Sequence, residues 1–139
     1  MITVGAELVL VLAIAARAAG GELSCPEIIQ VTGALAIPVE GWTEGRADEP
    51  HRLAGVTMFD GKPEERASLV GTERIISKTQ TGTTWNFAKG RQYWLTCSYA
   101  GTGVVLSTAI PGTIGSCTVT YARNVRVSGL PEIQRIDCK

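Results

Sequence analysis

Three carboxylates stand close together in the sequence and could support acid/base chemistry. They are Asp60, Glu64 and Glu65, and Pro63 directly precedes the two glutamates. A glycosidase needs two such groups, one of which keeps its proton because its pKa is raised. Proline also suits the first position of a helix, and glutamates suit the positive end of the helix dipole. The sequence therefore favours a short helical start over a catalytic pair. A small glycan- or peptidoglycan-active hydrolase using these carboxylates is the alternative.

Nucleophilic catalysis would have to use His51, the one histidine of the chain. A serine or cysteine nucleophile needs a base within hydrogen-bonding reach, yet His51 follows Asp48-Glu49-Pro50, which is typical of an exposed turn. The cysteines show no C-x-x-C spacing, and a zinc site groups its ligands on short loops or one face. We predict a protein without catalytic residues, metal or cofactor.

The charge of the chain gives no indication of a nucleic-acid partner. Lys and Arg total 13, as do Asp and Glu, so the formal net charge is zero. The charges are divided unevenly, because residues 20–65 hold nine acidic and three basic residues and residues 66–139 hold three acidic and nine basic. Folding can bring these halves together, or the C-terminal strands can present a basic face to an acidic partner.

The N-terminus has the features of a secretory signal. Residues 8–16 form an apolar run that is too short to span a bilayer and suits the hydrophobic region of a signal peptide. Ala16-Arg17-Ala18 then satisfies the small-x-small rule for signal peptidase. Glu7 stands where a signal usually carries a basic residue, so a short buried helix is the alternative. We predict a cleaved signal helix over residues 1–19, a single domain over residues 20–139, a periplasmic or secreted location and no membrane contact after cleavage.

An even number of cysteines in an exported chain predicts two disulfides, formed by Cys25, Cys97, Cys117 and Cys138. A bridge from Cys25 to Cys138 would close a very long loop and contribute roughly 4–5 kcal/mol. This first choice leaves Cys97 with Cys117. In a flat meander those two lie about 10 Å apart on strands separated by a third, beyond disulfide reach. The intervening strand would have to leave the sheet or curl, and crossed pairings stay open.

One stretch is the centre of the expected fold. Residues 92–99 alternate strictly, so that Tyr93, Leu95, Cys97 and Tyr99 share a core face. The apolar run 104–110 follows a glycine-rich turn and completes a β-hairpin. The alternation of residues 116–121 predicts a third strand beside it.

The remaining chain adds strands and one long loop. Further strands are predicted at residues 28–32, 52–59, 73–78, 83–87 and 133–138. Residues 33–50 read as a loop anchored in the core by Trp42. Many short strands with Gly/Pro turns indicate a mainly β fold, an antiparallel sandwich or curled barrel, with one short helix beginning at Pro63.

We expect a binding surface on a turn and a neighbouring tryptophan. The turn begins at Asp60, and the fixed φ of its proline lowers the entropic cost of presenting Glu64, Glu65 and Arg66 to a partner. Trp94 lies on the less apolar face of its strand, where an exposed indole would have the character of a hot spot. Alternatively, the turn only caps a helix and the indole packs beneath a neighbouring segment.

Three segments together resemble an uncharacterised family of small exported proteobacterial proteins. They are Cys25-Pro26, Phe59-Asp60-Gly61-Lys62-Pro63-Glu64-Glu65-Arg66-Ala67-Ser68-Leu69-Val70, and Tyr93-Trp94-Leu95-x-Cys97-x-Tyr99 with a later Cys117-x-Val119-x-Tyr121. The resemblance spans nearly the whole mature chain, and its second segment is specific. It implies a periplasmic protein without assigned activity, and members found near antibacterial secretion genes are candidates for immunity or accessory proteins.

A weaker similarity is to periplasmic inhibitors of lysozyme, which are small β-barrels with a Tyr-x-Cys strand. Ser128-Gly129 is similar to part of their inhibitory Ser-Gly-x-x-Tyr loop, but Glu132 stands where they have Tyr, which argues against inhibition of lysozyme itself. We predict a small periplasmic binding protein, such as an inhibitor or immunity protein against a cell-wall-active enzyme. Its partner would be another protein, for example a peptidoglycan-cleaving enzyme or toxin.

Overall fold

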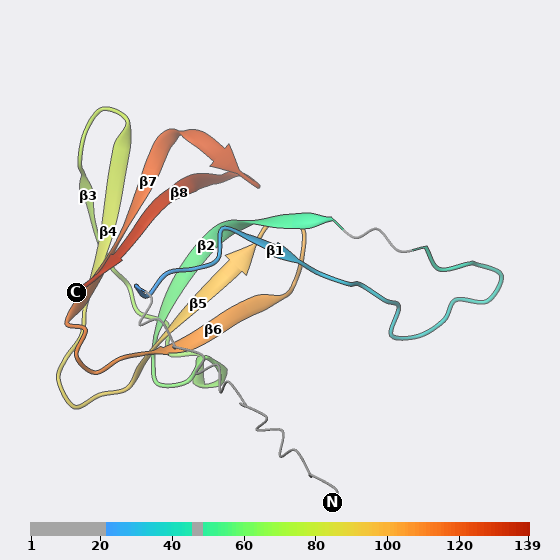
Figure 1. The fold of residues 1–139 in the computed structure, drawn as a ribbon, viewed down its shortest axis with the longest axis horizontal. Coiled ribbons are helices and arrows are strands. Elements are labelled where there is room, and N and C mark those ends of the chain that lie inside the picture. The colour runs from blue at the N-terminus through green and yellow to red at the C-terminus, as the bar shows by residue number, and fades with distance from the viewer. Residues whose placement is uncertain (1–21, 46–48) are drawn as a thin grey trace, which may run out of the picture.

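Two antiparallel four-stranded sheets make up the computed structural model, which describes residues 22–45 and 49–139 (Figure 1). The first sheet has the order β1-β2-β5-β6 and the second β3-β4-β7-β8. The elements are β1 (Ile28–Gln30), β2 (Pro50–Asp60), the 3₁₀ turn η1 (Pro63–Glu65), β3 (Thr72–Ile75), β4 (Gln80–Asn86), β5 (Tyr93–Tyr99), β6 (Val105–Ile110), β7 (Ser116–Val127) and β8 (Leu130–Cys138). The mainly β, antiparallel class is confirmed, and the expected helix is reduced to η1 within the described residues. The predicted signal lies outside them.

Strand β5 is the centre of the first sheet, between β2 and β6. Leu95 pairs with Met58 on one side and with Thr108 on the other. Leu95 and Met58 are fully buried, and the other three residues of the predicted core face, Tyr93, Cys97 and Tyr99, are buried as well. Burial of these large side chains is the main favourable term in the folding of the domain. The core face read from the alternation is confirmed.

The sequence predicted that strand β7 continues the meander beside β6. In the structure β7 belongs to the second sheet instead. It pairs with β4 and β8 after the turn at Pro111-Gly112-Thr113 carries the chain across. In the second sheet Cys117 and Val119 are fully buried against the inner face of the first.

The four cysteines form two disulfides, as predicted, but the predicted pairing is wrong. Cys117 bonds to Cys138, its register partner on the adjacent strand β8, with the Cα atoms 4.1 Å apart. Cys25 bonds to Cys97, with a Cα–Cα distance of 5.8 Å. The segment before β1 lies over the inner face of β5, where the Tyr99 hydroxyl donates a 2.9 Å hydrogen bond to the carbonyl of Pro26. The pairing therefore follows from the transfer of β7 to the second sheet.

Gly71, directly before β3, is closely packed against side chains of β4. A Cβ atom there would lie 2.4 Å from Thr83 Cγ2 and 2.7 Å from Trp85 Cε2. The Trp85 indole is held in place, because it is buried and its Nε1 donates a 3.1 Å hydrogen bond to the Leu69 carbonyl. We expect Gly71→Ala to lower the free energy of unfolding by about 1–3 kcal/mol, the usual cost of overpacking, as measured by urea unfolding.

The control is Gly112→Ala, because a Cβ at that turn position has no neighbour within 4 Å. Equal unfolding midpoints for the two variants would contradict the tight packing at Gly71.

Candidate binding surfaces

The turn after β2 is a defined structure that presents charged side chains. Glu64, Glu65 and Arg66 are exposed. The turn is closed by hydrogen bonds from the Glu65 N–H to the Lys62 carbonyl and from the Arg66 N–H to the Pro63 carbonyl, each 3.0 Å long. Arg66 ends η1 in the left-handed conformation, with φ 59°. A turn fixed in this way matches the preformed loop that the sequence predicted, and its role in binding stays a prediction.

The structure brings Asp60 and Trp94 to the same end of the first sheet but not to the same face. Asp60 is the register partner of Tyr93, whose side chain faces the core, whereas Trp94 pairs with Phe59 on the outer face. The Asp60 carboxylate is held in an ion pair with Arg91. The predicted site therefore divides into a charged turn and an outer aromatic position.

Trp94 is half-buried on the outer face of the first sheet. Its register partners are Phe59 on β2 and Ala109 on β6. The indole Nε1 is buried and finds no hydrogen-bond partner among the described residues. A buried polar group without a partner is costly. The half-buried indole leaves apolar area on the outer face, whereas its Nε1 is closed off from a partner on that face.

The geometry does not support the catalytic alternatives that the sequence left open. Glu64 and Glu65 stand on the outside of a turn, and Asp60 is engaged by Arg91. The His51 Nδ1 donates a 2.7 Å hydrogen bond to the carbonyl of Ala100, which is a structural role that ties β2 to the end of β5. Within residues 22–45 and 49–139, no group of three or more His, Cys, Asp or Glu could hold a metal ion. In that part of the chain, no helix is long and apolar enough to cross a membrane.

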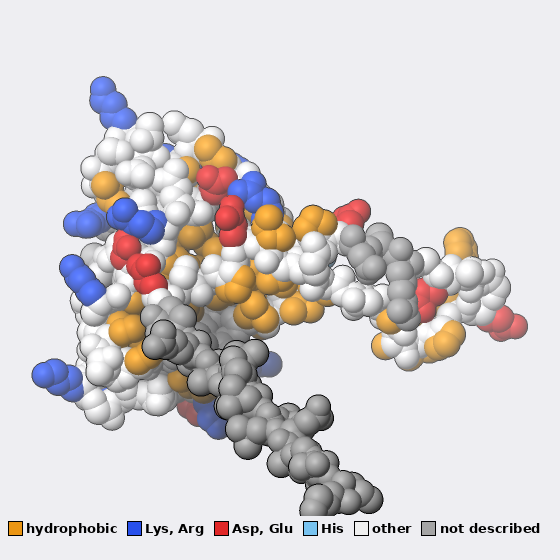
Figure 2. All heavy atoms as spheres, in the orientation of Figure 1, with side chains coloured by type: hydrophobic (Ala, Val, Ile, Leu, Met, Phe, Trp, Pro, Cys, Tyr) orange, Lys and Arg blue, Asp and Glu red, His pale blue; other side chains and the backbone are white. Residues whose placement is uncertain are grey.

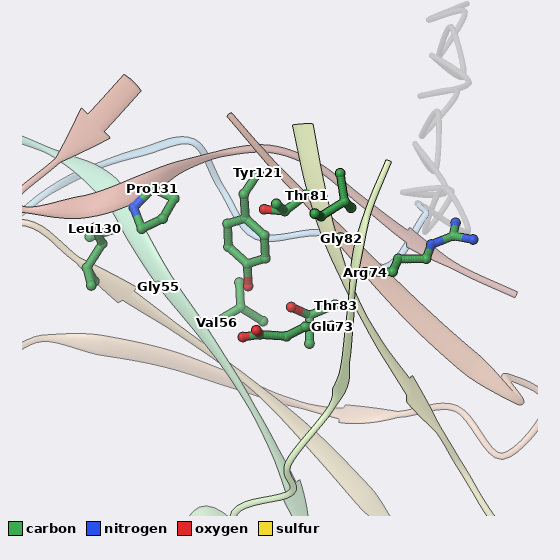
Figure 3. Close-up of a pocket in the computed structure, with 12 residues that line it drawn as sticks. Gly55, Val56, Glu73, Arg74, Thr81, Gly82, Thr83, Tyr121, Leu130 and Pro131 are labelled. Carbon is green, nitrogen blue, oxygen red and sulfur yellow. The ribbon is translucent and has the colours of Figure 1, made fainter. Parts of the chain in front are cut away.

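A cleft of about 670 Å³ opens where the inner faces of the two sheets diverge (Figure 3). Glu73 and Thr83 are register partners on β3 and β4, and Thr81 and Tyr121 are partners on β4 and β7. Figure 3 shows the Glu73, Thr83 and Tyr121 side chains pointing toward one another, while Arg74 points away. The apolar wall of the cleft includes Val56, Ile75, Leu130 and Pro131.

The chemistry of the cleft is that of a polar contact site rather than a catalytic one. Burial raises the pKa of the Tyr121 hydroxyl, a hydrogen bond with the Thr83 side chain lowers it, and the nearby Glu73 carboxylate raises it. The net direction is upward, so Tyr121 remains a neutral hydroxyl at physiological pH. Hydroxyls and one carboxylate suit recognition of a polar or cationic group. The sequence did not reveal this cleft, because its residues come from separate strands.

A long arm leaves the sheets between β1 and β2 (Figure 1). Residues 31–45 of this arm include four exposed hydrophobic side chains, with exposed fractions of 52% for Leu35, 78% for Ile37, 52% for Val39 and 80% for Trp42. The expectation that Trp42 anchors the loop in the core is therefore wrong. The physical reason is that the arm extends away from both sheets, so its apolar residues cannot reach the core.

The comparisons with known proteins match nearly all of the two sheets. The family model described as "Type VI secretion system Tli immunity protein" matches residues 47–139. A protein of Azospirillum brasilense, described as "Uncharacterized 16.3 kDa protein in trpG 5'region", is 28% identical over 128 residues, which cover 84% of this chain and 83% of that protein. No solved structure matches the chain. The family match contains three of the four cysteines and every strand of the structure except β1.

Proposed function

The chain belongs to the type VI secretion system Tli immunity protein family, and from this premise we propose that it neutralises one secreted toxin by binding it in the periplasm. The family match carries this proposal, because it covers residues 47–139 and so nearly the whole of both sheets. Immunity of this kind is a protein–protein interaction and needs no catalytic residue on the immunity protein.

The proposal includes a compartment and a class of toxin. Two disulfides join all four cysteines, and disulfides persist in oxidising compartments such as the bacterial periplasm. An immunity protein must meet its toxin where the toxin acts. We therefore propose a toxin that acts on the cell wall, such as a peptidoglycan-cleaving enzyme.

The experiment begins with capture of the toxin from periplasmic extract on the immobilised mature protein, followed by mass spectrometry. The captured protein is then directed to the periplasm of a test strain, with and without the full-length immunity protein. We expect killing without the immunity protein and survival with it. A captured protein that does not kill, or killing that the full-length chain does not prevent, would overturn the proposed function.

We propose the turn after β2 and Trp94 as one part of the toxin-binding surface. Glu64, Glu65 and Arg66 are exposed on a preformed turn, Asp60 holds Arg91 at its edge, and Trp94 supplies apolar area on the neighbouring outer face. Rigid presentation lowers the entropic cost of binding.

Two variants test this surface, Trp94→Ala and the double change Glu64→Ala with Glu65→Ala. For each we expect the affinity for the captured toxin to fall by about ten-fold or more, which corresponds to about 1.4 kcal/mol, with an unchanged thermal midpoint for the double change. Titration calorimetry and thermal unfolding give the two readouts. Lys78→Ala, which removes an exposed charge beyond β3, is the control. A lower midpoint with unaltered affinity would show that the residues are structural.

A further inference from the structure

We propose that the arm, defined as residues 31–45, inserts its apolar side chains into an apolar pocket with a basic rim on the toxin and thereby selects which toxin is bound. The inference rests on the proposed function, because the occupant is the toxin. It concerns a segment that the family match does not include, since that match begins at residue 47.

The first observation is the concentration of apolar surface on the arm. Ile37 and Trp42 are 78% and 80% exposed, and Figure 2 shows hydrophobic side chains gathered on the arm far from the sheets. Single exposed hydrophobic residues are ordinary, whereas a contiguous group marks an interaction site. Tryptophan is among the residues most enriched in binding hot spots. The arm is therefore suited to bury area against a partner.

The second observation is that the arm has internal order. Gly41 adopts φ +79°, a conformation that glycine reaches without strain, and the Trp42 N–H donates a 3.2 Å hydrogen bond to the Val39 carbonyl. The Leu35 N–H also donates a 2.8 Å hydrogen bond to Oε1 of Glu44, nine residues further along the chain. These contacts give the arm internal order, and order present before binding lowers the cost of ordering the arm on the toxin.

The apolar side chains of the arm act as a group. Leu35, Val39 and Trp42 line one shared hollow of about 500 Å³ together with Glu44. A side chain of the toxin can enter this hollow while the indole enters the toxin. Such mutual insertion excludes water from the centre of an interface, which is where binding energy concentrates.

Charge indicates the kind of pocket that the arm fits. Residues 31–45 contain Glu40 and Glu44 but no lysine, arginine or histidine, and Figure 2 shows acidic side chains beside the hydrophobic ones. Complementary charge speeds association and suppresses wrong partners. An acidic, apolar arm therefore fits an apolar pocket bordered by basic residues and disfavours an anionic lipid surface.

The same charge disfavours a second copy of this chain as the occupant. The inter-sheet cleft, which has an apolar wall, is a hollow of a second copy in which the arm could be placed, and Glu73 lies within it while Arg74 points away. Insertion of the arm would bring Glu40 and Glu44 toward the Glu73 carboxylate. Like charges brought together in a partly buried site are destabilising.

The test uses the captured toxin as the probe and compares Trp42→Ala with Val125→Ala. Val125 is the matched control, because it is an exposed hydrophobic residue (46%) on β7 that lines neither the cleft nor the hollow of the arm. We expect Trp42→Ala to weaken toxin binding by at least ten-fold without changing the thermal midpoint, and Val125→Ala to have little effect on either. An affinity of Trp42→Ala equal to that of wild type would overturn the inference.

A second variant tests the charge. Glu40→Lys is expected to slow association with the toxin several-fold at low salt, and the difference from wild type should shrink as salt screens the charges. Glu40 is preferred to Glu44, because the latter takes part in the hydrogen bond with Leu35. Association rates that do not respond to the substitution would contradict a basic rim.

The failure of this inference is distinguishable from failure of the proposed function. If wild type and both arm variants bind and protect equally, the arm is not the recognition element, while the immunity function stands. If wild type does not bind or protect, the proposed function fails and the inference fails with it. A dimer of the free protein that Trp42→Ala dissociates, or binding to phosphatidylglycerol vesicles that Trp42→Ala abolishes, would assign the arm to another occupant and overturn the inference.

Discussion

Joint replacement of Cys25 and Cys97 by alanine is expected to lower the free energy of unfolding by about 4 kcal/mol, against about 3 kcal/mol for joint replacement of Cys117 and Cys138. The difference arises because the first disulfide joins residues 72 apart and the second joins residues only 21 apart. A longer closed loop removes more chain entropy from the unfolded state. Either loss is a large share of the about 5–15 kcal/mol that typical domains possess.

Urea unfolding of the two double variants measures this order, and peptide mapping without reduction checks the pairing. Each variant should retain the other disulfide intact, because the two bonds lie in different parts of the fold. Peptides that join Cys25 to Cys138, or Cys97 to Cys117, in the native protein would contradict the pairing described above. A larger loss for the Cys117 and Cys138 variant would contradict the loop-length explanation.

What the sequence predicted well is local in origin. The alternation around Leu95 shows which residues of β5 face the core, since side chains on a strand alternate whatever the strand pairs with. The hairpin formed with β6 was predictable for the same reason, because the two strands are close in the chain and joined by a glycine-rich turn. A helical start at Pro63 was predictable for the same reason, although the structure has a single 3₁₀ turn there in place of the expected short helix.

What the sequence did not show depends on contacts between distant residues. The turn at Pro111-Gly112-Thr113 has the same composition whether the next strand joins β6 or crosses to the second sheet. The partner of Cys117 depends on that choice. The predicted pairing was wrong because joining Cys25 to Cys138 first left Cys117 only Cys97, whereas the register of the second sheet places Cys117 beside Cys138. The inter-sheet cleft needs the register of three strands to bring Glu73 to Tyr121. An isolated Trp42 in a long loop likewise gives no sign of whether the loop folds back.

Leu95→Ala is expected to lower the free energy of unfolding by about 2–5 kcal/mol, the range for a large buried side chain cut back to alanine. Leu95 is fully buried at the centre of the core, between β2 and β6. Val105 on the edge strand β6 is 51% exposed, so Val105→Ala should change stability by no more than about 0.5 kcal/mol.

Urea unfolding of both variants gives the comparison. If Leu95→Ala does not fold, Leu95→Met provides a milder change and should lose less than about 1.5 kcal/mol, because it nearly conserves volume. Equal losses for Leu95→Ala and Val105→Ala would show that β5 does not occupy the centre of the core.

The pairing of Gln30 with Pro50 at the base of the arm has a consequence for how such a protein can evolve. The two strands close the arm where it leaves the first sheet, and the residues that pair there lie outside the arm itself. Doubling the length of a flexible loop costs only about 0.6 kcal/mol. With the proposed role of the arm, a lineage that meets a new toxin could lengthen, shorten or recombine the arm at small cost to the inherited strands, and descendants with similar sheets could protect against different toxins.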